Sequence, residues 1–519
     1  MSQMLKSSGA MAVATMTSRL LGMVREMVYA AFMGNTWVAS AFNLAFMVPN
    51  LFRRLLGEGA LTAAFIPIFK EKEVANGEAD MWRAANAVIS GLVVAAGAVT
   101  VLVVAGLTLA LKVGEGHFSI ETRLMLELLR MMFPYMLLAC LAAVLIGMAN
   151  ARGHFFVPAL GAALLNIVMV ASVLWLAPQL GEKLEVRIFG LAIGVLLAGL
   201  VQALFQLPSL HREGYRYQWV APWKDPTVRE VARKMLPGSI GVAAFQINVL
   251  VTQAFSFCFD KTTVATFGYS VRLMELPQGV FGISLATYLL PTLAGLAAEK
   301  KFSEFKDTLR QGMGLLAFTN LFAAAISIAL AVPIVRLLFE RGLFGPDTTQ
   351  RVAISLACLA PGLLMFSLNN ILARAFYALK DIATPMKISV LCLVLNLAFS
   401  FWLVPQYREA GLGVANTMTA ALNTSLLIYA LRRKLKEFAL GAFSRNLLVL
   451  VGAAVLAGIV AGFAAGFWES RFGHATLSQK IAMVLIPSLA AGLVYGGIAI
   501  LGRVPAAAEI SNLVRKRFR

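Results

Sequence analysis

Long apolar stretches without charge alternate along the chain with short charged segments. After residue 80, uncharged stretches of about 20 residues or more cover 84–111, 131–151, 155–181, 188–210, 235–259, 276–298, 311–335, 352–373, 388–407, 410–431, 446–468 and 481–502. A helix of about 20 apolar residues crosses the ~30 Å hydrocarbon core of a membrane. The pattern therefore predicts about 12 transmembrane helices in this part of the chain.

The first 80 residues are apolar in stretches too, but charged side chains interrupt them. They predict two further helices, 7–33 and 37–69, joined at residues 34–36, which brings the total to about 14. Pro49 predicts a break just upstream of itself in the second of these helices. The fold class expected is an all-α, polytopic membrane protein.

Composition supports this class. The chain of 519 residues is 59% hydrophobic and 14% charged, against about 25% charged residues in globular domains. All four cysteines lie in apolar runs and are expected to be buried hydrophobes rather than disulfide partners or metal ligands. The four histidines are scattered, so no metal centre is expected. The first residues show no cleavable signal pattern, so the first apolar segment is expected to be retained.

The net charge of +19 would suggest a nucleic-acid partner on a soluble protein, but here it follows the membrane topology. Lysine and arginine concentrate on alternate loops, including 212–234, 300–310 and 432–436, and in the tail 515–519. The positive-inside rule therefore places both termini in the cytoplasm, and no nucleic-acid partner is expected.

A weak internal repeat links the two halves of the chain. Pro134, Ala151 and Pro158 recur at one constant offset as Pro361, Ala378 and Pro385. Coincidence in apolar sequence is the alternative. If the repeat is genuine, it predicts an N-terminal lobe at 1–212, a C-terminal lobe at 213–440 and a separate helix pair with a basic tail at 441–519. Parallel repeats of six spans bind substrate between the lobes, around a central cavity.

Charged side chains lie where the pattern predicts the membrane interior. A charge at the bilayer centre costs at least ~2.5–3.5 kcal/mol, so such residues normally face a wet cavity and are functional. Asn50, Arg54 and Glu58 have the i, i+4, i+8 spacing of one helix face, with Arg53 beside it. The candidate set is Arg19, Arg25, Glu26, Asn50, Arg53, Arg54, Glu58, Arg272 and Glu275.

Two interpretations of this set remain open. The arginines either pair with Glu26, Glu58 and Glu275 as contacts between helices, or extend to the membrane surface. Otherwise the surplus of five arginines over three carboxylates forms a cationic cavity for a phosphate-bearing substrate, since a guanidinium matches phosphate oxygens bidentately. The uncharged Gly- and Ala-rich spans 446–468 and 481–502 are expected either to pack closely or to form a lipid-facing groove for an acyl or prenyl chain.

Enzyme signatures are missing from the sequence: there is no P-loop, no HExxH and no Ser/His/Asp grouping. We therefore expect a transporter rather than an enzyme.

Several segments together resemble the MurJ (MviN) lipid II flippases of the MOP superfamily, which also contains the MATE exporters. They are Ser18-Arg19-Leu20-Leu21-Gly22 with Arg25, Pro49-Asn50-Leu51-Phe52-Arg53-Arg54 with Glu58-Gly59-Ala60, Arg272-Leu273-Met274-Glu275, and Arg374-Ala375-Phe376-Tyr377-Ala378-Leu379-Lys380-Asp381. The resemblance covers essentially the whole chain.

The resemblance implies two six-helix lobes around a central cationic cavity, plus a C-terminal pair that forms a hydrophobic groove. It assigns substrate binding to Arg19, Arg25, Asn50, Arg53, Glu58 and Arg272, with Arg54, Glu275 and Glu26 in support. The implied substrate is the undecaprenyl-pyrophosphate-linked disaccharide pentapeptide, moved from the inner to the outer leaflet of the bacterial cytoplasmic membrane by alternating access. We expect a monomer among membrane lipids, without a cofactor, whose coupling ion is unknown.

Two departures from the family pattern concern acids. Ser40 stands where the family has an acid in the second helix, and Val271 stands where an acid commonly precedes the arginine. The region 246–253 also lacks the acid through which some members bind sodium, so sodium coupling is not expected to follow from the resemblance. The alternatives are a flippase for another polyprenyl-linked oligosaccharide and a MATE-type exporter.

Overall fold

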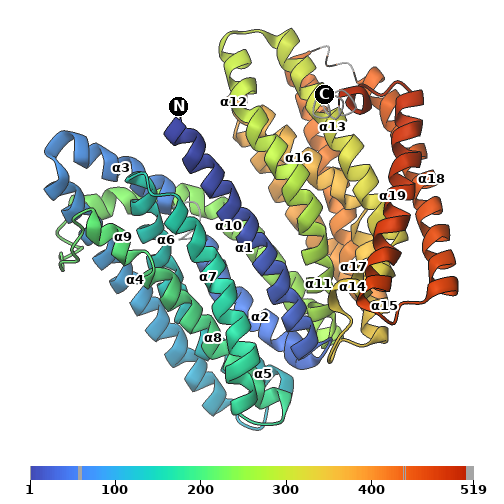
Figure 1. Ribbon diagram of the computed structural model, residues 1–519. Helices are drawn as coiled ribbons and strands as arrows, with labels where there is room; N and C mark the ends of the chain where they lie inside the picture. Colours follow the sequence, from blue (N-terminus) through green and yellow to red (C-terminus); the bar gives the residue numbers. More distant parts are fainter. Residues whose placement is uncertain (1, 56–60, 437, 439, 510–519) are drawn as a thin grey trace. The chain divides into compact units, whose positions relative to one another are not determined.

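The computed structural model describes residues 2–55, 61–436, 438 and 440–509, and in these ranges all regular structure is helical. Contacts group the chain into two compact units, Met1–Phe257 and Cys258–Arg519. Figure 1 shows the long helices of each unit running alongside one another. This confirms the predicted all-α class.

Unit 1 contains ten α-helices. They are α1 (Ser2–Met33), α2 (Trp37–Phe52), α3 (Leu61–Asn76), α4 (Glu78–Val113), α5 (Ile120–Met132), α6 (Tyr135–Ala151), α7 (Phe156–Ala171), α8 (Leu184–Leu204), α9 (Leu207–Arg212) and α10 (Pro226–Phe259). The predicted join at 34–36 is confirmed, because Thr36 caps α2 by accepting a hydrogen bond from the Ala39 amide.

The predicted helix 37–69 is interrupted, and the position of the break differs from the expectation. Pro49 lies inside α2, with regular helix on both sides, and α2 ends three residues later at Phe52. Residues 53–55 then adopt a π-helical turn. Proline removes one backbone donor and crowds the preceding turn, and this helix changes its geometry downstream of Pro49 rather than upstream. Glu58 lies outside the described residues.

Unit 2 contains the remaining helices. They are α11 (Thr263–Pro277), a π-helical segment (Gln278–Ile283), α12 (Ser284–Ala298), α13 (Phe302–Ala329), α14 (Ala331–Phe339), α15 (Pro346–Leu359), α16 (Gly362–Ala378), α17 (Ala383–Leu435), α18 (Gly441–Phe472) and α19 (Leu477–Leu501). The backbone of Arg408 is non-helical (φ 50°, ψ −125°), so α17 consists of two helices joined at a kink. This kink lies between the predicted spans 388–407 and 410–431.

Nine helices of the described chain are long and apolar enough to cross a membrane, or ten if the bent pair α15–α16 forms one span. About 14 spans are consistent with that number if four further spans are added. These are α1 and α10, which carry charges, the broken pair α2–α3, and the second of the two helices that the kink separates in α17. The total of 14 itself stays a prediction.

The internal repeat is confirmed by the backbone. Helices α6 and α16 begin and end at positions that differ by the same 227 residues as Pro134 and Pro361, and α7 and α17 begin at that offset too. The turns after α6 and α16 also match. The His154 amide donates to the Ala149 carbonyl, and the Asp381 amide donates to the Phe376 carbonyl, both at 2.9 Å. Bonds of this type also end other helices of the chain, as from the Tyr215 amide to the Leu210 carbonyl, so the shared helix bounds are the stronger evidence for the repeat.

One guanidinium joins four helices of unit 1 (α3, α4, α6 and α9). Arg152, at the end of α6, pairs with three carboxylates, those of Glu73, Glu78 and Glu213, and lies over the Trp82 ring. The pKa of Glu213 lies below its usual range because His154 and Arg152 both hydrogen-bond to it. A network of this kind is worth more than isolated surface pairs.

The last two helices belong to unit 2, where α18 packs on α13 and α19. The buried face of α18 carries alanines at four-residue spacing: Ala453, Ala457, Ala461 and Ala465. Small side chains let helices approach closely, so close packing is confirmed for this face.

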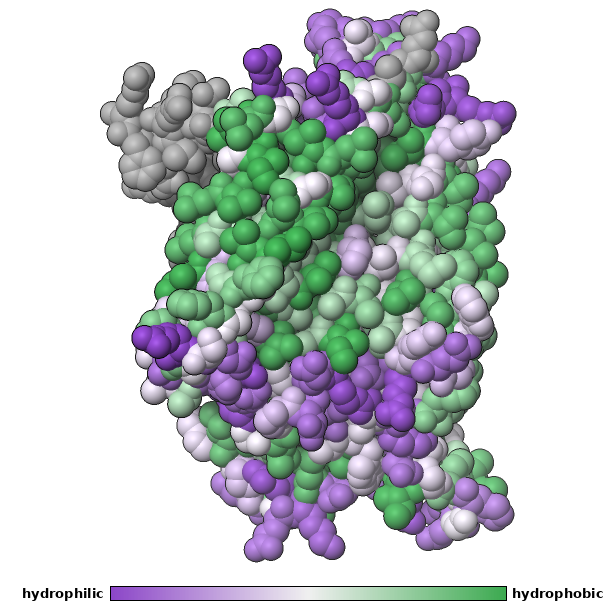
Figure 2. All heavy atoms as spheres, turned by 90° about the vertical axis from the view of Figure 1, so that its right-hand side faces the viewer, coloured by the Kyte–Doolittle hydropathy of each residue, from purple (hydrophilic) through white to green (hydrophobic). Residues whose placement is uncertain are grey.

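Figure 2 shows the outer surface of this unit as a broad hydrophobic area bounded by hydrophilic residues, as expected for a surface in lipid. A prenyl groove there, like the division at 212/213 and 440/441, stays a prediction.

Candidate functional site

Arg25 has the most developed surroundings of the predicted residues. Its side chain, 18% exposed, donates one hydrogen bond from Nη1 to Asn166 Oδ1 at 3.0 Å and another from Nη2 to Glu26 Oε1 at 2.6 Å. Its guanidinium also lies 5.6 Å from the centroid of the Tyr29 ring. Arg25 is therefore held in one orientation inside an apolar helix.

Asn166, on α7, was not among the predicted site residues. It is buried, and besides accepting from Arg25 its amide donates to the Ser18 carbonyl of α1 at 3.2 Å. Gly22 of α1 lies next to the same amide, and a Cβ built on it would be 3.8 Å away, an ordinary contact distance. An amide in the middle of the uncharged span 155–181 was the available signal, but its partner Arg25 is 141 residues away in the chain.

Asn50 and Arg53 lie together at the end of α2. The Arg53 Nε donates to Asn50 Oδ1 at 2.9 Å, and both residues are half-buried, as is Arg54. The spacing of one helix face aligns Asn50 with Arg54, whereas the hydrogen bond to Asn50 comes from Arg53. The i, i+4 spacing requires a regular α-helix, and the chain becomes π-helical at Arg53.

Arg272 and Glu275 form the predicted pair of unit 2. They are on α11, and Nη1 of Arg272 lies 2.8 Å from Glu275 Oε2, with 43% and 47% of the two side chains exposed. A half-exposed pair one helical turn apart stabilises a fold only weakly. A guanidinium has five N–H donors, and this contact uses one of its nitrogens.

Arg19 is exposed on α1 and forms no hydrogen bond or ion pair with the described part of the chain. The structure thus brings together Arg25 with Glu26, Asn50 with Arg53, and Arg272 with Glu275. In the first and third pairs an acid neutralises an arginine, as one of the two interpretations expects. Each of these pairs lies within one helix, however, and does not connect two helices. A central cavity that gathers all these residues stays a prediction.

Among the described residues, no three His, Cys, Asp or Glu side chains are arranged to hold a metal ion. Ser40, at the position of the family acid, is fully buried in α2. In the region expected to hold sodium in some relatives, Thr252 donates to the backbone carbonyls of Asn248 and Val249.

Solved structures show which class of fold this is. The chain matches a structure titled as the lipid II flippase MurJ in an inward closed conformation, with a TM-score of 0.74 and 21% identity over 98% of this chain and 99% of that one. It also matches an inward-facing MATE-family multidrug resistance transporter of the MOP superfamily, with a TM-score of 0.66 and 14% identity over 83% of this chain. The fold is that of a MOP-type membrane transporter.

Sequence comparison then places the chain within this class. The family model described as lipid II flippase MurJ matches residues 29–501. A probable lipid II flippase MurJ of Vibrio cholerae is 34% identical over 83% of this chain and 85% of its own length. One of Haemophilus influenzae is 32% identical over 94% and 98%, and a lipid II flippase MurJ of Burkholderia cenocepacia is 31% identical over 94% and 95%. The chain belongs to the MurJ lipid II flippase family.

Proposed function

We propose that this protein moves lipid II, the undecaprenyl-pyrophosphate-linked disaccharide pentapeptide, from the inner to the outer leaflet of the bacterial cytoplasmic membrane. The observation that carries the proposal is the match of residues 29–501 to the lipid II flippase family. It is supported by arginines held inside apolar helices, such as Arg25, whose side chain is 18% exposed. No bond of the substrate is made or broken, so the protein acts as a transporter and not as an enzyme.

Substrate binding is proposed for Arg19, Arg25, Asn50, Arg53, Glu58 and Arg272, with Arg54, Glu275 and Glu26 in support. Guanidinium groups in a site of low dielectric attract an anion strongly, and their paired N–H groups fit pyrophosphate oxygens. Glu26 and Glu275 would hold Arg25 and Arg272 in position until the pyrophosphate arrives. The two lobes would then open alternately to the two sides of the membrane.

The protein is a multi-pass membrane protein, and we propose that both termini lie in the cytoplasm. We further propose that one chain suffices, that membrane lipids surround it, and that neither a cofactor nor a nucleic acid takes part. The MATE-like fold favours an exporter of organic cations as the second candidate. Such a substrate would require an acidic site, whereas the predicted site carries more arginines than acids.

Transport by the purified protein in liposomes tests the proposal. Labelled lipid II in the inner leaflet becomes accessible to a reagent added outside only if the protein moves it. Arg272→Ala should lower the rate at least about tenfold, because a charge-assisted hydrogen bond to an anion is lost. Arg272→Lys should retain part of the rate, since it retains the charge.

Arg123→Ala is the matched control, because Arg123 also pairs with an acid one turn further along its helix. It should leave the rate unchanged. Transport of a phosphate-free organic cation in place of lipid II would support the exporter and reject the flippase.

A further inference from the structure

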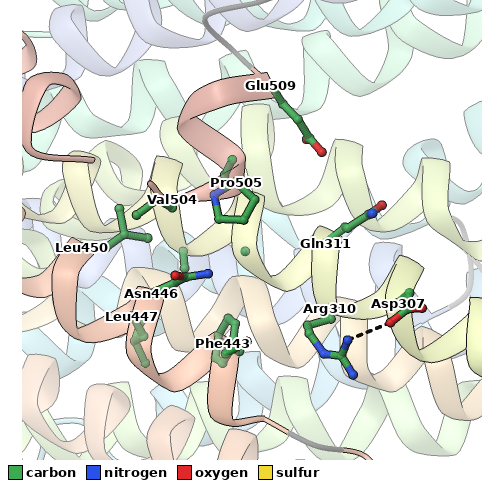
Figure 3. A pocket seen from close by; sticks show the side chains of 14 residues that line it. Asp307, Arg310, Gln311, Phe443, Asn446, Leu447, Leu450, Val504, Pro505 and Glu509 are labelled. Atoms are coloured by element: carbon green, nitrogen blue, oxygen red, sulfur yellow. Dashed lines mark hydrogen bonds and ion pairs between the residues drawn. The ribbon is translucent and has the colours of Figure 1, made fainter. Parts of the chain in front are cut away.

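A cavity of about 280 Å³ lies within unit 2, and its lining includes none of the residues proposed to bind lipid II. Helices α13 and α18 and the segment after α19 enclose it. Its volume is at the lower end for ligand pockets, enough for a headgroup but not for a whole lipid. Arg310, Asn446 and Glu509 supply polar groups at its wall (Figure 3).

The polar groups of the cavity lack a full set of partners. Arg310 uses Nη1 to pair with Asp307 Oδ1 at 2.7 Å, but its buried Nε has no hydrogen-bond acceptor in the part of the chain that is described. The half-buried amide of Asn446 and the carboxylate of Glu509 likewise form no hydrogen bond or ion pair there. Figure 3 shows Asn446 and Glu509 on different parts of the cavity wall, with the Arg310 guanidinium turned toward Asp307. Glu509 is exposed, so the buried Nε of Arg310 is the group that most favours a ligand with an acceptor atom.

Apolar side chains form the other part of the wall. Ala317, Leu450 and Val504 are almost completely buried there, and Leu447 lies beside them. Next to the cavity residues Leu447 and Leu450, α18 exposes the apolar side chains of Leu448 and Val451. The cavity thus has polar groups beside a surface that lies in lipid, as a site for one lipid molecule requires.

The position along the helices corresponds to headgroup depth. Arg310 lies eight residues after the start of α13, Asn446 five residues after the start of α18, and Val504 follows the end of α19 at Leu501. All three helices therefore reach the same membrane surface, the one that the lysine and arginine pattern predicts to be cytoplasmic.

The charges of the wall select the kind of headgroup. One guanidinium and two carboxylates, those of Asp307 and Glu509, give a net charge of −1, which disfavours a purely anionic lipid. A phosphate beside Arg310 and a primary ammonium beside the carboxylates would satisfy both signs. A choline headgroup has no N–H to donate to a carboxylate, so it fits less well.

We propose that this cavity binds the headgroup of a zwitterionic phospholipid with a primary ammonium, such as phosphatidylethanolamine, as a resident lipid of the C-terminal unit. The phosphate contacts Arg310 and the Asn446 amide, the ammonium contacts Glu509, and the acyl chains lie along Leu448 and Val451 of α18. The proposal does not depend on lipid II transport.

Native mass spectrometry of the full-length purified protein tests it, with phosphatidylethanolamine, phosphatidylcholine and phosphatidylglycerol each added after delipidation. The wild type should retain phosphatidylethanolamine about fivefold better than either other lipid, the ratio expected from one partly exposed charge pair. Glu509→Gln should reduce this retention to the level of phosphatidylcholine, whereas Glu299→Gln, an exposed acid outside the cavity, should not.

A second test of the proposal fills the cavity without removing a charge. Gly314 lines the cavity, and a Cβ there meets nothing within 4 Å, so Gly314→Leu should fold and displace the lipid. Gly466→Leu, on α18 with equally open surroundings but outside the cavity, is its control. Equal retention of the three lipids by the wild type, preference for phosphatidylglycerol, or unchanged retention in Gly314→Leu would overturn the proposal.

Discussion

Asn166 links the predicted substrate-binding residue Arg25 to a second helix. It accepts from the Arg25 guanidinium and donates to the Ser18 carbonyl, so it fixes both the arginine and the helix that carries it. A hydrogen bond to a charged group contributes about 1.5–3 kcal/mol. We therefore regard Asn166 as a positioning residue for Arg25.

Asn166→Ala should lower lipid II transport about tenfold at limiting substrate and less at saturation, because Arg25 loses its orientation before the substrate binds. Initial rates in liposomes at several lipid II densities measure this. Asn320→Ala, which removes a buried amide of unit 2 bonded to Leu316 and Ser367, is the matched control and should not change the dependence on lipid II.

A double mutant separates positioning from general loss of structure. If Asn166 acts through Arg25, then Asn166→Ala should have little further effect in the Arg25→Ala background. Additive losses would show that the two residues act independently, contrary to the assigned role.

Asp381 provides a pH-dependent contact at the turn between α16 and α17. Its pKa falls from 3.8 to about 2, chiefly because Lys434 hydrogen-bonds to the carboxylate, with a further hydrogen bond from the Thr384 amide. Since the folded pKa lies below the unfolded one, the contact stabilises the fold fully above about pH 4. That contribution is lost as the pH falls toward 2.

Asp381→Asn should therefore lower the free energy of unfolding by about 1 kcal/mol at pH 7, a value reduced for the exposure of Lys434. The difference from wild type should shrink between pH 4 and pH 3. Thermal unfolding midpoints in detergent at these pH values measure it, with Glu115→Gln, an exposed loop acid, as the control. A difference that stays constant down to pH 3 would contradict the assigned pKa.

At the scale of elements, the repeated turns after α6 and α16 have the same hydrogen bonds but different residues at the left-handed position. Gly153 has φ 85° after α6, and Lys380 has φ 59° after α16. An L-residue in this conformation costs roughly 1–2 kcal/mol relative to glycine. The same turn is thus strained in one lobe and relaxed in the other.

Opposite substitutions should therefore have opposite effects. Gly153→Ala should lower the thermal unfolding midpoint, and Lys380→Gly should leave it unchanged or raise it, since the entropy that glycine adds to the unfolded chain offsets part of the relief. Ala151→Gly, inside the end of α6, controls for added chain entropy and should be destabilising. Destabilisation by Lys380→Gly equal to that of Gly153→Ala would contradict the shared turn geometry.

Elements that leave a pattern along the chain could be predicted from the sequence. The length of the uncharged stretches located the spans. The constant offset between Pro134 and Pro361 revealed the repeat that the helix boundaries confirm. The π-helical turn after Phe52 could not be predicted, because proline signals a break without fixing where the backbone accommodates it. Asn166 could not be found either, since its role depends on a contact between α1 and α7.

At the scale of the whole molecule, the proposed function means that a MOP-type fold carries an anion instead of a cation. In α1, the guanidinium of Arg25 contacts the neutral amide of Asn166 and the carboxylate of Glu26. Arg53 likewise contacts the neutral Asn50. Asn50 contacts Arg53 without cancelling its charge, whereas the Glu26 carboxylate offsets part of the charge of Arg25. Because the candidate set carries five arginines against three carboxylates, we expect it to keep a net attraction for pyrophosphate.

The most direct measurement is the accessibility of lipid II at the outer face of cells depleted of this protein. Depletion should make lipid II inaccessible to an external reagent within the time that the protein takes to disappear. Re-expression of the wild type or of Arg123→Ala should restore access, while Arg272→Ala at equal abundance should not. Unchanged accessibility on depletion, with no other protein able to move lipid II, would contradict the proposed function.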